Sequence, residues 1–217
     1  MARFPLPPHG RIPNFEGAER AAQLLKKTEA WQKAQVLKCN PDSPQRPVRE
    51  NALSEGKTVY MAVPRLKEER CFIELHKNRI YGSPTKAATI KGAFKWGKKV
   101  GPEHMKKVDM VIAGSVAVNK DGGRVGKGGG YSDLEYAIGR EFGLVDDETP
   151  VVSTIHELQL IPDDIPTSIH DVPMDILVTP KRVIEIPKRQ KPQGILWDEL
   201  DEEKIEAIPL LKKLSDR

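Results

Sequence analysis

The residues with the clearest chemical potential lie in one glycine-rich segment, DGGRVGKGGGYSD at positions 121–133. It follows an apolar run, 108–118, that predicts a buried strand, and it precedes residues 134–138, which predict a helix. Glycine lets backbone N–H groups approach an oxyanion closely, and the N-terminus of the following helix adds positive potential. Arg124 and Lys127 place two cations in the same segment. The segment therefore predicts a phosphate-binding loop.

Two common phosphate-binding motifs do not describe this loop. A P-loop requires Gly-Lys followed by Ser or Thr, whereas Gly126 and Lys127 are followed by Gly128, and the G-x-G-x-x-G spacing of dinucleotide-binding turns is absent. A flexible surface turn remains the alternative, since glycine also supplies positive φ wherever a turn demands it. The two cations within the loop, with Tyr131 and Asp133 at the predicted helix start, favour binding.

Length and composition indicate a globular protein that is large enough to bury a sizeable core. The chain has 217 residues, of which 38% are hydrophobic and 30% charged, and these proportions exclude a disordered chain. No apolar run reaches the roughly 20 residues of a membrane helix, and the Pro-rich N-terminus lacks the apolar core of a signal peptide. We therefore expect a cytoplasmic protein with no membrane partner.

Charge and cysteine content bear on two further classes of protein, those that bind nucleic acid and those stabilised by disulfides or zinc. The net charge of +4 favours anionic ligands only weakly, and the basic clusters 91–107 and 181–191 are interpreted as solvated faces. Nucleic acid is therefore a less favoured partner than a small anion. Cys39 and Cys71 are too few for a secreted disulfide framework and have no zinc-type spacing. We expect both to be buried as small apolar residues.

The predicted elements alternate between strands and helices along the chain. Strands are expected at 34–39, 58–63, 71–75, 108–113, 149–155 and 176–178, with a short edge strand at 183–186. Helices are expected at 16–27, capped by Asn14, and at 28–33, 48–55, 85–99 and from 134 onward. Trp96, in the fourth of these helices, is interpreted as a core aromatic and not as a ligand contact.

This order predicts an α/β domain, 1–187, with a mostly parallel sheet flanked by helices in a Rossmann-like three-layer arrangement. Residues 188–217 are expected to form a connector and a C-terminal helical extension interrupted by Pro209. In such folds ligands bind outside the carboxyl ends of the strands. The glycine-rich loop follows one of these strands, so the fold and the loop predict the same site.

The loop and the strand before it resemble the signature of a known family. Val108-Asp109-Met110-Val111-Ile112 followed by the 121–133 loop is similar to the pattern D-G-x-R-(L/V)-G-x-G-x-G-Y-Y-D of the 5-formyltetrahydrofolate cyclo-ligase family, also called methenyltetrahydrofolate synthetase. The likeness spans about residues 4–197 and is closer to the subgroup of methenyltetrahydrofolate synthetase domain-containing proteins. That subgroup is similar to this chain at 11–15, 64–66, 114–118, 149–152, 170–171, 179–180 and 182–184.

The resemblance implies a cyclo-ligase-like fold and an enzyme that uses ATP and Mg²⁺ to convert 5-formyltetrahydrofolate, or a related formyl-pterin, into the 5,10-methenyl form. In that reaction the formyl oxygen attacks the γ-phosphorus of ATP, and N10 of the folate then attacks the activated carbon. The resemblance also implies roles for residues of this sequence. Arg124, Lys127 and Tyr131 are expected to be catalytic; Gly126, Lys127, Gly128, Gly129, Gly130 and Tyr131 to bind the nucleotide; Asp42, Arg65 and Tyr131 to bind the folate; and Asp133 to bind Mg²⁺.

Four of the residues to which the resemblance assigns a role also have a structural alternative. Asp133 could be an acid stabilised by the helix dipole alone, and Tyr131 could be a core aromatic. Asp42, set among prolines, could be a turn residue, and Arg65 could form a surface ion pair. Structural or hydrogen-bonding roles are expected for the two histidines that belong to no triad or metal pattern, His156 and His170.

Two departures from the family pattern leave a second function open. Ser132 stands where the family usually has a second tyrosine, and the sequence begins at the Phe-Pro block that a basic, ATP-holding helix precedes in the family. Three explanations are open: a start further upstream, a nucleotide held without that helix, or no turnover of ATP. The alternative function is a non-catalytic nucleotide- or phosphate-binding module with RNA or protein partners. The sequence predicts no oligomeric state.

Overall fold

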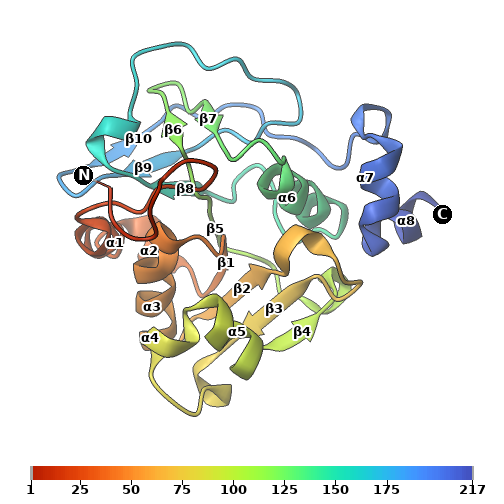
Figure 1. The fold of residues 1–217 in the computed structure, drawn as a ribbon, viewed down its shortest axis with the longest axis horizontal. Coiled ribbons are helices and arrows are strands. Elements are labelled where there is room, and N and C mark those ends of the chain that lie inside the picture. Colours follow the sequence, from red (N-terminus) through yellow and green to blue (C-terminus); the bar gives the residue numbers. More distant parts are fainter. Residues whose placement is uncertain (1, 217) are drawn as a thin grey trace.

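The computed structural model describes residues 2–216, and its centre is one mixed sheet (Figure 1). Its strands, in spatial order, are β10 (Val183–Glu185), β9 (Ile176–Val178), β8 (Val151–Thr154), β5 (Met110–Ile112), β1 (Val36–Cys39), β2 (Thr58–Ala62), β3 (Phe72–Leu75) and β4 (Lys98–Val100). From β9 to β2 neighbouring strands are parallel, whereas β10, β3 and β4 pair antiparallel at the two edges. The mostly parallel sheet predicted from the sequence is confirmed.

Helices cover both faces of the sheet (Figure 1). On one face lie α1 (Ala18–Leu25), α2 (Glu29–Lys33), α3 (Arg46–Ser54), α4 (Pro84–Ala87) and α5 (Ile90–Trp96), and on the other lie α6 (Tyr131–Glu141), α7 (Glu202–Ala207) and α8 (Pro209–Ser215). A two-stranded ribbon of β6 (Ala117–Val118) and β7 (Arg124–Val125) precedes α6. The predicted three-layer arrangement is therefore confirmed.

The alternation of side chains along the strands explains how both faces are covered. Leu37 and Met110 belong to the core beneath α1–α5, while Val36 and Val111 belong to the core beneath α6. Successive residues of a strand face opposite sides, so a strand buried on both faces is apolar at nearly every position. Lys38 departs from this pattern, because it is 4% exposed and lies on the α6 face of β1.

The predicted helix 85–99 is wrong in its C-terminal part. The chain forms α4, breaks at Thr89, whose side chain caps α5 by accepting a backbone hydrogen bond at 3.0 Å, and ends α5 at Trp96. Residues 98–100 instead pair with β3. Lysine is depleted in strands, so the open edge of β3 decides the conformation of this segment. Trp96 packs, partly buried, against the core, as predicted.

The start of α1 also differs from the prediction. Gly17, with φ of 89°, occupies the N-cap position, and Asn14 instead donates to Phe4 O at 2.9 Å and accepts from Phe15 N at 3.1 Å. A Cβ at position 17 would lie 2.7 Å from Pro180 Cγ. Close packing against the turn after β9 therefore sets where α1 begins, and the predicted cap by Asn14 is wrong.

The C-terminal extension is helical, as predicted, with Pro209 in the first turn of α8, where the missing N–H of proline removes no helical hydrogen bond. Ile208, Leu210 and Leu211 are buried in the core on the α6 face. The division of the chain at residue 187 stays a prediction. Within residues 2–216, no helix has both the length and the apolar character needed to cross a membrane.

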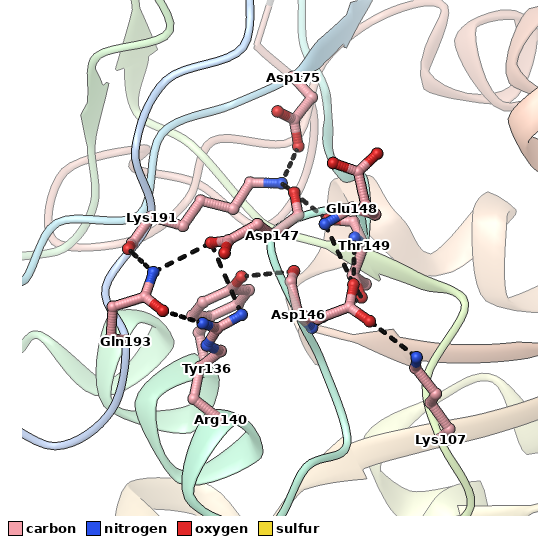
Figure 2. Close-up of polar contacts among 10 residues, drawn as sticks. All are labelled: Lys107, Tyr136, Arg140, Asp146, Asp147, Glu148, Thr149, Asp175, Lys191 and Gln193. Atoms are coloured by element: carbon pink, nitrogen blue, oxygen red, sulfur yellow. Dashed lines mark hydrogen bonds and ion pairs between the residues drawn. The ribbon is translucent and has the colours of Figure 1, made fainter.

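A buried lysine anchors the connector after β10 at the N-terminal ends of β8 and β9 (Figure 2). Lys191 Nζ lies 2.7 Å from Asp175 Oδ2 and donates to two carbonyls of the loop before β8, at 3.0 and 2.8 Å. The side chain of Lys191 is 2% exposed, whereas that of Lys188 is 67% exposed. The interpretation of 181–191 as a solvated face therefore holds for Lys188 and is wrong for Lys191.

Replacing Lys191 by alanine should lower the free energy of unfolding by about 3 kcal/mol, because Asp175, whose side chain is 13% exposed, and two backbone carbonyls lose the buried ammonium group that pairs with them. Lys188→Ala is the matched control, since an exposed ion pair contributes about 1 kcal/mol or less. Urea denaturation followed by circular dichroism measures both variants. Equal losses in the two variants would contradict the anchoring role of Lys191.

Candidate active site

A cleft of about 660 Å³ lies beyond the C-terminal ends of β1, β2 and β5. β2 pairs with one side of β1 and β5 with the other, and such a reversal leaves a crevice between the loops that leave the strands. The walls of the cleft include every residue that the sequence predicts for the site: Asp42, Arg65, Arg124, Gly126, Lys127, Gly128, Gly129, Gly130, Tyr131 and Asp133. The structure thus brings the candidates together, and their individual roles stay predictions.

Arg124 and Asp133 form a buried ion pair in the wall of this cleft. Arg124 Nη2 donates to Oδ1 and Oδ2 of Asp133, at 2.8 and 2.6 Å, and Nη1 donates to Gly114 O at 3.1 Å. The two side chains are 6% and 11% exposed. Asp133 Oδ1 also accepts from Val172 N at 3.2 Å. Arg124 therefore fixes the loop both to the segment after β5 and to the first turn of α6.

This pairing bears on the predicted magnesium ligand. Both carboxylate oxygens of Asp133 already accept hydrogen bonds. In the described part of the chain, 2–216, no group of three or more Asp, Glu, His or Cys side chains is placed to hold a metal ion. Mg²⁺ in nucleotide sites is held by one or two carboxylates together with phosphate oxygens and water. The role of Asp133 stays a prediction, and a bound Mg²⁺ would share the carboxylate with Arg124, since Oδ2 accepts only one hydrogen bond.

Lys127 and Asp42 form a second, more exposed ion pair. Their Nζ and Oδ1 atoms are 2.9 Å apart, and the side chains are 45% and 13% exposed. Arg49, which is 1% exposed, holds the loop around Asp42 by donating to the carbonyls of Asn40, Pro41 and Asp42, at 2.5, 3.1 and 3.1 Å. Because exposed ion pairs are weak in water, an anionic ligand can compete with Asp42 for Lys127.

The glycine loop leaves a row of backbone amides without protein acceptors. Among residues 2–216, the amides of 126–130 donate to no acceptor, and α6 has no side-chain N-cap. Gly128 and Gly130 have φ of 86° and 63°, which glycine adopts without strain. Adjacent amides at the N-terminus of an 11-residue helix provide the donors that a bound phosphate requires.

Arg65 combines an exposed cation with a strained backbone. Its φ is 57°, and the next residue, Leu66, has φ of 52°. The left-handed region costs a non-glycine residue about 1–2 kcal/mol, and such strain persists where the surroundings impose it, often at functional sites. Leu66 is fully buried, whereas Arg65 is exposed in the cleft wall and has no ion-pair partner within residues 2–216. The surface ion pair considered for Arg65 is therefore not formed there.

A buried polar network that the sequence did not predict lies beside the loop. Lys38 Nζ forms an ion pair with Glu135 Oε2 and donates to Asn40 Oδ1 at 2.8 Å, and Asn40 Nδ2 donates to Ser132 Oγ at 3.2 Å. The side chains of Lys38 and Glu135 are 5% and 7% exposed. The available signal was a lysine inside an apolar strand, but nothing local indicates that its partner comes from α6. Ser132, at the position of the family's second tyrosine, accepts the hydrogen bond that holds Asn40.

The histidines and cysteines have mainly structural environments. His156 Nδ1 accepts a backbone hydrogen bond at 3.2 Å, and its ring packs edge-on against Phe15. His170 lies exposed in the wall of the cleft, and its expected structural role stays a prediction. Cys39 and Cys71 are buried, as predicted. Burial raises the pKa of the Cys71 thiol to about 12, which keeps it protonated and unreactive near neutral pH.

The parallel strands, the crevice at their C-terminal ends and the glycine loop before α6 define an α/β protein with a glycine-rich loop at a topological switch point. The chain belongs to the 5-formyltetrahydrofolate cyclo-ligase family, whose family model matches residues 7–180. The resemblance inferred from the glycine loop and its flanking segments is therefore confirmed.

Individual relatives agree with this assignment. The chain is 40% identical to a methenyltetrahydrofolate synthase domain-containing protein of Mus musculus and 39% identical to one of Homo sapiens; each match covers 100% of this chain but only 59% and 57% of those proteins. The chain thus spans less than two thirds of their length. The structure of 5,10-methenyltetrahydrofolate synthetase from Aquifex aeolicus matches with a TM-score of 0.54 at 21% identity, over 81% of this chain and 84% of that one. This likeness shows a shared fold.

The two ion pairs of the site should differ in their effect on stability. Arg124→Met should lower the free energy of unfolding by about 3–5 kcal/mol, because Asp133 keeps a buried and unpaired charge. Lys127→Met should lower it by about 1 kcal/mol or less, because its ion pair is exposed to solvent. Urea denaturation of the two variants measures the difference. A loss for Arg124→Met as small as that for Lys127→Met would rule out the buried pair as the anchor of the loop.

Proposed function

We propose that this protein catalyses the ATP-dependent cyclisation of 5-formyltetrahydrofolate, or of a related formyl-pterin, to its 5,10-methenyl form. The observation that carries the proposal is the unpaired amide row of 126–130, which lines the same cleft as Lys127 and Arg65 in a member of the cyclo-ligase family. The related fold of Aquifex aeolicus 5,10-methenyltetrahydrofolate synthetase supports it. Both substrates are anionic, and the cleft supplies cations and N–H donors.

The chemistry transfers one phosphoryl group and closes one ring. The formyl oxygen attacks the γ-phosphorus and ADP leaves; N10 then attacks the activated formyl carbon and loses its proton, and the C–O bond breaks as inorganic phosphate departs. The protein's contribution to such a reaction is to position the two substrates and to stabilise the charge that develops on oxygen. ATP supplies the leaving group that makes loss of the formyl oxygen favourable.

We assign these tasks to residues of the cleft. The amides of 126–130 and Lys127 hold the phosphates, with Lys127 exchanging Asp42 for a phosphate oxygen. Once released, Asp42 accepts hydrogen bonds from the pterin ring. Arg65 pairs with an anionic group of either substrate, and Tyr131 packs against the pterin or the base. Arg124 acts from within the wall, by keeping the loop in place through Asp133 and the carbonyl of the segment after β5.

Magnesium and cellular location are parts of the same proposal. Mg²⁺ would reach the cleft with the phosphates of ATP, and Asp133 is the carboxylate of the loop that could contribute to holding it. We also propose a cytoplasmic location, in keeping with folate substrates and with the expectation from the sequence.

A non-catalytic phosphate-binding module is the second candidate, and Ser132 favours it. Its hydroxyl is engaged by Asn40, so the position that carries a phenol in the family pattern offers no ring to a substrate. The basic segment 91–107 would then be a surface for RNA or protein partners, since Lys91 and Lys95 are exposed and have no acidic partner among residues 2–216. Nucleotide binding without turnover would be its signature.

Purified protein incubated with MgATP and 5-formyltetrahydrofolate should form the methenyl product, which is followed by its absorbance. Omission of ATP should abolish the signal, since no group is then available to carry away the formyl oxygen. Calorimetry with ATP on the same preparation separates the two candidates. Folded protein that binds ATP but forms no product would exclude the enzyme and support the binding module.

Lys127→Ala should weaken ATP binding by about 1–3 kcal/mol, roughly 5- to 150-fold in Kd, because it removes a charge-assisted hydrogen bond to phosphate. Asp42→Asn should tighten ATP binding, because it frees Lys127 from its ion pair. Lys120→Ala, which changes an exposed lysine of the preceding turn, is the control and should leave Kd unchanged. Calorimetric Kd values that are equal for all three variants would assign Lys127 to solvent.

A further inference from the structure

A lysine of the C-terminal extension reaches the glycine loop from outside the segment that the family model matches. Lys204, in α7, lies beyond residues 7–180. Its Nζ donates to Gly129 O at 3.0 Å and lies 5.4 Å from the centre of the Tyr131 ring. A Cβ placed on Gly130 would be 3.2 Å from the same nitrogen. One ammonium group therefore contacts Gly129 and Tyr131 and leaves little room for a side chain at Gly130, at the start of α6.

The position of Lys204 is set by the packing of the extension. α7 has no fully buried residue of its own, but Ile208, which precedes α8, and Leu210 and Leu211 of α8 are buried in the core on the α6 face. Ile205, next to Lys204, also packs partly buried against that core. These contacts place α7 and α8 beside α6 (Figure 1). Apolar packing against this core, to which Tyr131 of the loop also contributes, thus holds the lysine side chain beside the loop.

The partners of Lys204 differ from those of the two cations within the loop. Arg124 is paired with Asp133 and Lys127 with Asp42. Within residues 2–216, Lys204 has no carboxylate partner; it contacts a carbonyl oxygen and an aromatic face. A cation over the face of an aromatic ring is attracted to it and restricts how the ring turns. The charge of Lys204 is therefore used to order the loop and is not cancelled by an acid.

The contact with Gly129 O also orients a donor. The C=O of residue 129 and the N–H of Gly130 belong to one planar, trans peptide unit, so they point to opposite sides. Holding the oxygen toward α7 turns the N–H of Gly130 away from α7. That amide is one of those for which residues 2–216 offer no acceptor, and Gly130 lines the cleft.

We infer that Lys204 is a positioning residue of the phosphate-binding loop: by binding Gly129 O and the face of Tyr131, it presents the loop amides to the anionic ligand, and it makes the C-terminal extension part of the site. The identity of that ligand as ATP rests on the proposed function above. The orientation of the loop by Lys204 does not depend on it.

The experiment compares three variants with the wild-type chain. Lys204→Met keeps the apolar stem and removes the charge and donors; Lys204→Arg restores both; Lys212→Met, on α8, removes an exposed lysine whose side chain is 54% exposed and serves as the matched control. Each is measured by hydrogen exchange of peptides spanning 126–131 without ligand, by calorimetry with ATP, and by its Tm. If Lys204→Met does not fold, Lys204→Gln takes its place.

Lys204→Met should speed exchange in the 126–131 peptides and raise the Kd for ATP by roughly tenfold, the loss of one charged hydrogen bond, with Tm close to that of wild type. Lys204→Arg should restore both values, and Lys212→Met should change neither. If the protein catalyses the cyclisation, Lys204→Met should raise the KM for ATP more than the KM for the folate.

Unchanged hydrogen exchange in the loop of Lys204→Met would overturn the inference. Failure of wild-type protein to bind ATP would overturn the proposed function instead, and the exchange data would still decide the role of Lys204.

Discussion

The buried ion pair between Arg124 and Asp133 is the interaction on which the cleft depends. It joins the ribbon strand β7 to the first turn of α6, and its remaining hydrogen bonds reach Gly114 after β5 and Val172 before β9. Removing two charges from water is costly, and the cost is offset only when the geometry is good and other hydrogen bonds complete the pair. Both conditions are met here. The glycine loop, which has little conformational preference of its own, is thereby held between two fixed points.

Buried lysines perform a similar structural task elsewhere in the fold. Lys38 pairs with Glu135 under the cleft, and Lys191 pairs with Asp175 at the opposite, N-terminal ends of the strands. Lys57 donates to the carbonyls of Trp31 and Ala34, at 3.0 and 2.5 Å. Each ammonium group supplies three donors and so can satisfy several acceptors that would otherwise be buried unpaired. Because Lys38 and Lys191 are each paired with an acid, these ion pairs add nothing to the formal net charge of +4.

The two ends of the parallel strands differ in what their carboxylates and backbone amides bind. At the N-terminal ends, Asp109 accepts from the backbone amides of Gln35 and Val36, at the start of β1, both at 2.9 Å. Asp175, which is paired with Lys191, accepts from Val151 N at 2.7 Å. At the C-terminal ends, the acids Asp42 and Asp133 are paired with cations. The amides of 126–130 have no acceptor and Arg65 has no ion-pair partner among residues 2–216. Carboxylates thus complete the backbone hydrogen bonding at the N-terminal ends of the strands, while the C-terminal ends retain donors for an anionic ligand.

The sequence by itself determined the strands of the central sheet other than β4, the three-layer class and the position of the glycine loop, because apolar periodicity and glycine placement act over a few residues. It did not predict β4 or the β6–β7 ribbon. It also predicted where the cleft lies, since 121–133 and a strand end suffice for that, and the roles of the residues in the cleft stay predictions. Tertiary structure decided which charges meet: that Arg124 faces Asp133, that Lys38 finds its partner in α6, and that 98–100 completes the edge of β3. It also decided that Lys204 reaches the loop. These contacts join segments far apart in the chain, and the energy of burying a charge selects its partner only after the core has brought those segments together.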